Sequence, residues 1–294
     1  MKDRALSTIG LWVVVGLVIW IGGFFSVAEQ ASFGLLALII GAAQYEFYSL
    51  AQRIPGVRRP SLSGVVAGFA LHFALFFLAP EEARANALLT GGALLVGLHL
   101  LSLLRNPGEV PPLLSRFPTL YGFAYLPFML ASLIAIARMK DGHLLTAQSV
   151  GLYYVVWVFV ATKFTDVGGL LFGVPFGKHK IAPNISPAKS WEGCLGGLAT
   201  SAGASALFAW LLRDAFNIDF MVPWKAAVLA LPIAVLSIPS DLIESVFKRL
   251  AGAKDSGATI PGIGGALDLI DSMVLTSPVA LILLSYFLDW AKRG

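Results

Sequence analysis

Acidic and basic side chains gather in residues 240–272, beside a glycine-rich turn, in a chain that is otherwise largely apolar. Charge next to hydrocarbon costs free energy, so such a cluster indicates a functional site. Carboxylate oxygens suit magnesium or manganese, and Lys and Arg donors suit phosphate oxygens. The segment therefore predicts metal-assisted chemistry on a phosphate-bearing substrate. Its charged members are Asp241, Glu244, Lys248, Arg249, Lys254, Asp255, Asp268 and Asp271.

A helix over 241–250 would place two carboxylates and an ammonium group on one face. Asp241, Glu244, Ser245 and Lys248 are spaced i, i+3, i+4 and i+7, which are neighbouring positions on a helix. That face is predicted to hold a cation and to contact a phosphate group.

The start of the last predicted helix carries a second acidic face. Asp268, Asp271 and Ser272 share it, and Gly264 and Gly265 come directly before it. The amides of that turn would meet an anion at the helix N-terminus. Because the acids would repel a bare phosphate, we expect a bridging divalent cation, Mg²⁺ or Mn²⁺, with a second cation left open.

A second polar stretch, residues 162–197, begins at Asp166 inside an apolar run. Asp166 is a candidate metal ligand, and Gly168 and Gly169 would allow another backbone or a ligand to approach closely. Ser190 is predicted to cap the helix that follows. Gly173 and Gly177 are too closely spaced for a P-loop. The candidate phosphate donors of this stretch are Lys178, His179, Lys180 and Lys189.

The charged residues of both stretches must be positioned by apolar, membrane-spanning segments. The 294 residues are 57% hydrophobic and 13% charged, whereas soluble domains carry about 25% charged residues. The sequence therefore predicts an all-α, polytopic integral membrane protein with about nine transmembrane helices. We place them near 9–27, 33–51, 62–79, 86–104, 119–137, 147–172, 193–212, 222–239 and 273–290.

Lys and Arg residues predict the orientation of the spans. With the N-terminus inside, thirteen fall in inside segments against seven outside, and Lys163 lies within a span. We therefore expect a cytoplasmic N-terminus and a site facing the cytoplasm, in a bacterial inner membrane. The net charge of +4 suits anionic lipid headgroups, and no basic tract indicates nucleic acid.

We expect one integral domain, with an N-terminal transmembrane scaffold (1–160) and a C-terminal catalytic half (161–294). Cys194 is the single cysteine, which excludes an intrachain disulfide. Glu46, near the end of the second predicted span, has two interpretations. It snorkels at the membrane interface, or it supports the site or a helix pair.

The polar stretches resemble the phosphatidate cytidylyltransferase (CDP-diacylglycerol synthase) family. The resemblance covers roughly 162–272, and the N-terminal half agrees only in being helical and apolar. The family signature is matched by Ser245, Lys248, Arg249, Lys254, Asp255, Gly257, Ile260, Pro261, Gly262, Gly264, Gly265, Asp268 and Asp271. An upstream block is matched by Thr165, Asp166, Gly168, Phe176, Gly177, Lys178, Lys180, Pro183, Ile185, Ser186, Pro187, Lys189, Ser190, Trp191, Glu192 and Gly193.

The resemblance implies transfer of cytidylyl from CTP to phosphatidic acid, giving CDP-diacylglycerol and pyrophosphate in the lipid bilayer. A homodimer is compatible with it. The implied metal ligands are Asp166, Asp241, Asp268 and Asp271. The implied catalytic residues are Asp241, Asp268, Asp271, Lys248 and Arg249. Substrate contacts are expected from Lys178, Lys180, Ser186, Lys189, Ser190, Glu192, Glu244, Ser245, Lys254, Asp255, Gly264 and Gly265.

Three positions depart from the family pattern. Ile263 replaces a histidine, Leu269 an arginine and Ala188 a lysine. None of the replacements donates a hydrogen bond to phosphate, so Lys189 and Arg249 would have to compensate. The acids are retained, and binding of the metal, the main charge neutraliser, depends on them. An active enzyme is therefore expected.

Two other functions remain open. A CTP-dependent polyprenol or phytol kinase would transfer the γ-phosphate and release CDP. A non-enzymatic anion transporter would line a path with these charges, although transporter sites usually lie near the membrane midplane in broken helices.

Overall fold

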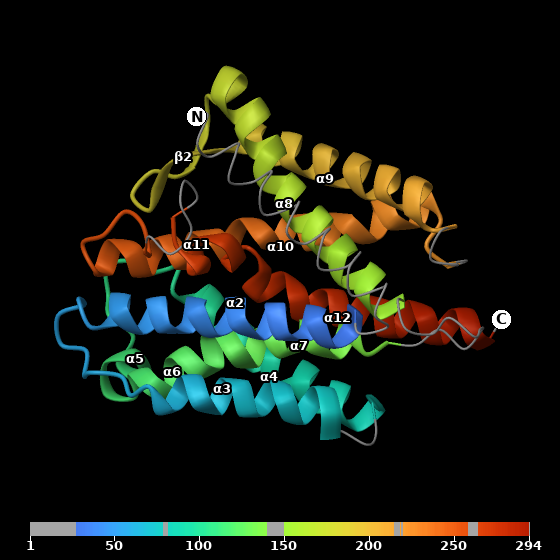
Figure 1. Cartoon of the computed structure of the whole chain (residues 1–294). Helices are drawn as coiled ribbons and strands as arrows, with labels where there is room; N and C mark the ends of the chain where they lie inside the picture. Colours follow the sequence, from blue (N-terminus) through green and yellow to red (C-terminus); the bar gives the residue numbers. More distant parts are fainter. Residues whose placement is uncertain are drawn as a thin grey trace.

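The computed structural model describes residues 28–78, 82–139, 150–214, 218, 220–257 and 264–293, and these are almost entirely helical (Figure 1). One two-stranded hairpin interrupts the helices. The elements are α2 (Ala28–Ala51), α3 (Ser63–Phe73), η1 (Ala74–Leu78), α4 (Glu82–Ser102), α5 (Pro112–Arg116), α6 (Pro118–Phe123), η2 (Ala124–Phe128), α7 (Met129–Ala137), α8 (Val150–Phe176), β1 (Lys180–Ala182), β2 (Ser186–Ser190), α9 (Trp191–Leu212), α10 (Pro223–Leu250), α11 (Ala266–Ile270) and α12 (Met273–Arg293).

Six helical segments of the described chain are long and apolar enough to cross a membrane, which confirms the helical, membrane-type architecture. They are Gln30–Ala51, Pro118–Ala137, Val150–Phe176, Trp191–Leu212, Pro223–Leu250 and Ala266–Leu288. Two further apolar helices, Ser63–Leu78 and Leu89–Ser102, are shorter and coincide with predicted spans. The predicted span 9–27 lies outside the described residues, so the count of nine stays a prediction.

Small residues let α8 and α9 pack closely. A methyl group added at Gly168 would lie 2.7 Å from the carbonyl oxygen of Gly196 and 2.5 Å from the Thr200 hydroxyl oxygen. One added at Gly197 would lie 2.7 Å from the Thr165 carbonyl oxygen. Close approach through small residues is a common way for membrane helices to associate. The expectation that Gly168 admits another backbone is confirmed.

An aromatic cluster joins the N-terminal helices to α10. The ring centroids of Phe47 and Phe247 lie 5.2 Å apart, and Tyr121 and Tyr125 pack on both rings. All four side chains are buried. Helices from both halves of the sequence thus share one hydrophobic core, which fixes α2 against the charged end of α10.

Two local features differ from the predicted spans. Helix α10 continues to Leu250 instead of ending near 239, although Pro232 and Pro239 lie inside it. Membrane helices tolerate proline because neighbouring groups satisfy the freed carbonyls. The hairpin β1–β2 was not predicted, and its pairs are Lys180 with Ser190 and Ala182 with Ser186. Strands this short leave no alternating hydrophobic pattern.

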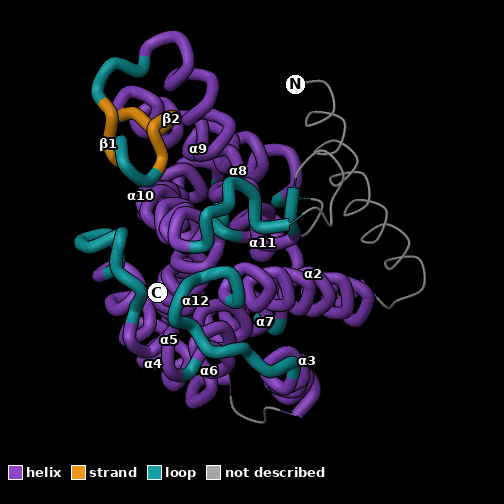
Figure 2. Tube along the Cα trace, turned by 90° about the vertical axis from the view of Figure 1, so that its left-hand side faces the viewer, coloured by secondary structure: helices purple, strands orange, loops and turns teal. Residues whose placement is uncertain are grey.

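The loops that the sequence assigned to the inside meet at one end of the bundle, at the left in Figure 1. Arg249 at the end of α10 donates to the carbonyl of Ile185, next to the hairpin. The amide of Arg58, after α2, donates to the carbonyl of Ser115 in α5. Figure 2 shows the hairpin in orange beside α9 and α10. The charged segments are therefore gathered on one side, and the assignment of that side to the cytoplasm remains a prediction.

Candidate active site

Three carboxylates meet where α10 passes the turn before α12. Asp241 and Glu244 lie about one helical turn apart on α10, and Asp271 lies between α11 and α12. One oxygen from each lies within 4.8 Å of the other two. The helical face predicted for 241–250 is thus formed, and it meets the predicted Asp271.

Glu244 is the most deeply buried of the three, with 0% of its side chain exposed. Its Oε2 pairs with the Lys248 ammonium group, and its Oε1 has no hydrogen-bond partner among the described residues. A buried carboxylate is costly unless it is paired or binds a metal. Three converging carboxylates with free acceptor capacity fit a hard divalent cation such as Mg²⁺ or Mn²⁺.

Lys163 brings a positive charge to the edge of this cluster. Its Nζ lies 2.8 Å from the Ser272 hydroxyl oxygen and 3.5 Å from both Asp166 Oδ2 and Asp271 Oδ1. The Ser272 hydroxyl also donates to Asp166, at 3.3 Å. Asp166 therefore lies beside the three carboxylates, connected to them through Lys163 and Ser272. Sequence reasoning treated Lys163 only as an interruption of a span, although a Lys–Asp pair at i and i+3 inside an apolar run was a usable signal.

The hairpin supplies a second ammonium group. Lys189 on β2 lies 2.8 Å from Asp241 Oδ2 and donates to the carbonyl of Ile238 at 3.1 Å. The amide of Gly193 donates to the Ser190 side chain, so the predicted N-cap of α9 is confirmed. That cap fixes the end of β2 and with it the position of Lys189.

Asp268 is not one of the three converging carboxylates, although it shares Lys248 with Glu244. It accepts hydrogen bonds from the Gly265 amide and the Ser256 hydroxyl, both at 2.7 Å, and from Lys248 at 2.9 Å. Of the predicted ligands, the structure thus brings Asp241 and Asp271 together with Glu244, while Asp268 holds the turn before α11. Lys248 links the two groups, since it also pairs with Glu244.

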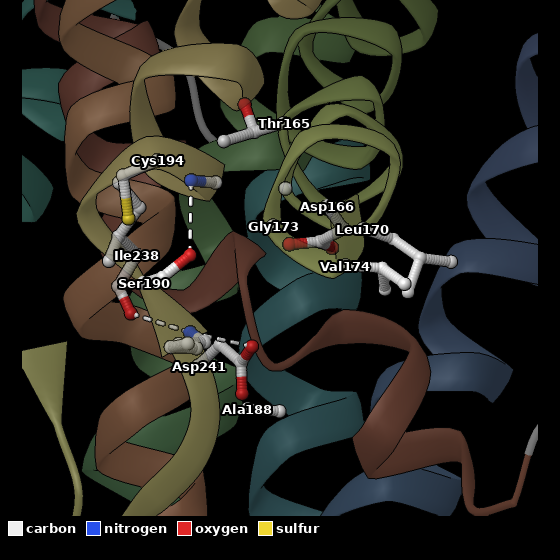
Figure 3. Close-up of a pocket in the computed structure, with 13 residues that line it drawn as sticks. Thr165, Asp166, Leu170, Gly173, Val174, Ala188, Ser190, Cys194, Ile238 and Asp241 are labelled. Atoms are coloured by element: carbon white, nitrogen blue, oxygen red, sulfur yellow. Dashed lines mark hydrogen bonds and ion pairs between the residues drawn. The ribbon is translucent and has the colours of Figure 1, made fainter. Parts of the chain in front are cut away.

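A cavity of about 220 Å³ opens beside Asp241, between α8, β2, α9 and α10. Figure 3 shows Asp166 beside Leu170 and Val174 on α8, with Asp241 on the other side of the cavity. Leu170 and Val174 are exposed on α8, where a membrane helix meets lipid. The cavity thus offers charged groups next to a hydrocarbon-facing wall.

Glu192 organises the loop before β1. Its carboxylate accepts from the backbone amides of Lys178 and His179 and lies 2.6 Å from the His179 ring nitrogen Nδ1. The predicted substrate contact Glu192 is therefore engaged within the protein. Lys178 and Lys180 themselves are exposed at the hairpin.

The remaining predicted residues surround the cluster at different depths. Ser245 is buried and lies 3.5 Å from Asp241 Oδ1. Arg249 is exposed and donates to backbone carbonyls rather than facing the carboxylates. Lys254 and Asp255 are exposed, and Ser186 is half-buried in β2.

Glu46, on α2, supports the glycine-rich turn before α11. It is buried, and its Oε2 accepts from the amide of Leu267 at 2.9 Å. A methyl group added at Gly257 or Gly265 would collide with its carboxylate. Of the two interpretations, snorkelling is wrong, because burial and this hydrogen bond place Glu46 in support of the turn. Gly264 has φ +119°, a left-handed conformation that favours glycine.

The departures from the family pattern have different surroundings. Leu269 is buried in the hydrophobic core, and Ala188 lines the cavity beside Lys189. Ile263 lies outside the described residues. An arginine at 269 would need a different environment, so this chain has adapted that position to apolar packing.

Relatives named phosphatidate cytidylyltransferase match part of the chain. The Haemophilus influenzae protein is 33% identical over 182 residues, 62% of this chain and 62% of its own length. The Staphylococcus saprophyticus protein is 39% identical over 155 residues, 52% of this chain and 57% of its own. The Staphylococcus aureus protein is 39% identical over 137 residues, 47% of this chain and 51% of its own. The chain thus spans roughly three fifths or less of the length of each.

The match at family level is more extensive than these alignments. The sequence profile described as "Cytidylyltransferase family" matches residues 2–287, nearly the whole chain. The segments that hold the carboxylates, Lys163, Lys189 and the supporting Glu46 all lie within this match. The chain belongs to the cytidylyltransferase family.

Proposed function

We propose that this protein transfers the cytidylyl group of CTP to phosphatidic acid and releases pyrophosphate, producing CDP-diacylglycerol. The reaction takes place at the cytoplasmic side of a bacterial inner membrane. Family membership and the printed names of the relatives support the reaction class. The apolar helices support the membrane setting.

One observation carries the proposal: Asp241, Glu244 and Asp271 converge within 4.8 Å, with Lys189 and Lys163 paired to the two aspartates. Both substrates of the reaction are anions and repel each other. A site that combines a cation with lysines is what would bring two phosphates together.

Asp241, Glu244 and Asp271 would hold one divalent ion, Mg²⁺ or Mn²⁺. When bound, that ion neutralises negative charge on the phosphate oxygens and helps to orient them. Asp166, a predicted ligand, is paired with Lys163. The ammonium group of Lys163 therefore supplies the second positive charge at that position.

In the reaction, a phosphate oxygen of phosphatidic acid bonds to the α-phosphorus of CTP. The bond from the α-phosphorus to the oxygen that bridges to the β-phosphorus breaks, and pyrophosphate leaves with that electron pair. The attacking phosphate is already anionic, so no nucleophile from the protein is needed. The protein contributes positioning and charge neutralisation, as in phosphoryl transfer generally.

The hairpin and α8 would receive the two substrates. Lys178 and Lys180 are exposed there and offer donors to the nucleotide phosphates. Leu170 and Val174, at the apolar side of the cavity, would contact the acyl chains. The lipid phosphate then lies next to Asp241 and Lys189.

Product analysis tests this function. The purified full chain is given phosphatidic acid or, in a parallel reaction, a polyprenol, together with Mg²⁺ and CTP labelled at either the α- or the γ-phosphate. We expect α-label in the lipid and γ-label in pyrophosphate. A lipid kinase would instead place γ-label in the lipid and release CDP, and a transporter would turn over neither label. The variant Lys189→Gln should lose most of the transfer, whereas Arg53→Gln, an exposed loop arginine, should retain it.

A further inference from the structure

A second cavity, of about 530 Å³, lies between the start of α3 and the α5–α6 corner. None of the residues that line it lines the cavity beside Asp241. Three of its residues are arginines, namely Arg58 and Arg59 from the loop after α2 and Arg116 from the end of α5. No carboxylate lines it.

Among the residues that the structure describes, these guanidinium groups have no partner. All three residues are exposed, and none forms an ion pair or a side-chain hydrogen bond within the described chain. Each guanidinium offers five donors in a planar fork that matches the oxygens of a phosphate group. Three guanidinium groups around one cavity, each with free donors among the described residues, therefore favour binding of an anion.

The apolar side of the cavity indicates which kind of anion. Phe117 and Leu120 line it and are 56% and 64% exposed. Leu62 and Val66, at the start of α3 next to it, are 60% and 69% exposed. A free phosphate would make no use of these side chains. A phospholipid would place its phosphate on the arginines and its acyl chains along α3 and α6.

The position of the cavity agrees with a lipid ligand. The start of α3 and the α5–α6 corner, which line it, lie at the same end of the bundle as the hairpin and α11 (Figure 1), where helix ends would meet the membrane surface. Juxtamembrane arginines attract the anionic lipids of a membrane leaflet, each contributing roughly a factor of five in affinity.

The cavity is also connected to α2. The Tyr48 hydroxyl donates to the carbonyl of Thr119 at 2.7 Å, and the Gln44 amide donates to the carbonyl of Gly64 at 2.9 Å. Thr119 and Gly64 line the cavity, and Glu46 on the same helix holds the turn before α11. A ligand in this cavity would therefore contact the elements that fix α2.

We propose that Arg58, Arg59 and Arg116 form a binding site for the phosphate headgroup of an anionic phospholipid, separate from the site of chemistry. The lipid acts there as a bound structural ligand of the membrane leaflet. The phosphodiester of phosphatidylglycerol has the required charge and shape and is not a substrate of the proposed transfer reaction.

Native mass spectrometry of the detergent-purified full chain tests the proposal. Dioleoyl-phosphatidylglycerol is titrated without nucleotide, with dioleoyl-phosphatidylcholine as the neutral comparison. We expect tight retention of phosphatidylglycerol only, and an affinity about 10- to 30-fold weaker in Arg59→Gln/Arg116→Gln. The matched control Arg53→Gln/Arg105→Gln removes two exposed loop arginines outside the cavity and should bind as the wild type does.

Two further measurements complete the test. The active-site variant Lys189→Gln should retain phosphatidylglycerol, which separates this site from the site of cytidylyl transfer. A phosphatidylglycerol carrying a photoreactive acyl chain should label wild-type peptides from 58–70 or 112–123, a result that does not depend on any variant folding. The proposal is overturned if the cavity and control variants bind alike, if inorganic phosphate displaces the lipid fully, or if labelling falls elsewhere.

Discussion

The ammonium group of Lys163 on α8 lies 3.5 Å from the carboxylate of Asp271, in the turn before α12. The same group contacts Asp166 and Ser272. A lysine at the edge of a cluster of acids lowers their mutual repulsion without filling the space that a divalent ion needs. We therefore expect Lys163 to affect how strongly the remaining carboxylates attract a cation.

Replacing Lys163 with methionine should change both the Mg²⁺ dependence of turnover and the turnover at saturating Mg²⁺. Removing a positive charge beside the carboxylates should make the half-saturating Mg²⁺ concentration of turnover fall. Turnover at saturating Mg²⁺ should drop by about 10²-fold, the scale of losing one electrostatic contact to the transition state. A purely structural lysine would leave the Mg²⁺ dependence unchanged, and that result would remove Lys163 from the site.

Replacing Glu244 with glutamine should lower activity without lowering stability. Glu244 is fully buried, and Lys248 retains Asp268 as a partner after the change. The neutral side chain avoids the desolvation of a carboxylate, so thermal unfolding without divalent ions should occur at the same or a higher temperature. Cytidylyl transfer should nevertheless fall by about 10²-fold. The exposed loop variant Glu109→Gln is the control. Full activity of Glu244→Gln would contradict the assignment.

Asp268→Asn should differ from Glu244→Gln in its effect on stability. Asp268 holds Ser256, Gly265 and Lys248 together, so its loss leaves Lys248 with one acidic partner and loosens the turn before α11. We expect a lower unfolding temperature together with at least about 10²-fold lower transfer. Thermal unfolding of the divalent-free protein measures the first effect. An unchanged unfolding temperature would show that Asp268 does not anchor this turn.

The close contact of α8 with α9 predicts a pair of glycine variants with opposite signs. Gly168→Ala would force the methyl group against Thr200 and the Gly196 carbonyl, at a cost of about 1–3 kcal/mol. Gly203→Ala, also in a helix interior, meets nothing within 4 Å and should gain about 0.5–1 kcal/mol. Equal effects of the two variants on chemical unfolding would argue against the α8–α9 contact.

Patterns local in sequence predicted the parts of the site that lie on one helix. The face of Asp241, Glu244 and Lys248 follows from helical spacing, and the Ser190 cap follows from residue type and position. Long apolar runs also predicted most helices, because membrane spans are long and uniform.

Contacts between distant segments were not predictable from the pattern. Glu46 and Leu267 lie far apart in the sequence, and nothing in either segment indicates that they meet. Asp268 and Asp271 lie one turn apart, yet one faces Ser256 and the other Lys163. Only the break between α11 and α12 decides which acid joins the cluster.

Binding of Mn²⁺ to the purified full chain, followed by electron paramagnetic resonance, tests the central claim most directly. We predict one tightly bound ion in the wild type, retained in Glu109→Gln and lost in both Glu244→Gln and Asp271→Asn. Unchanged Mn²⁺ binding in these two carboxylate variants would contradict the claim that Asp241, Glu244 and Asp271 form the metal centre.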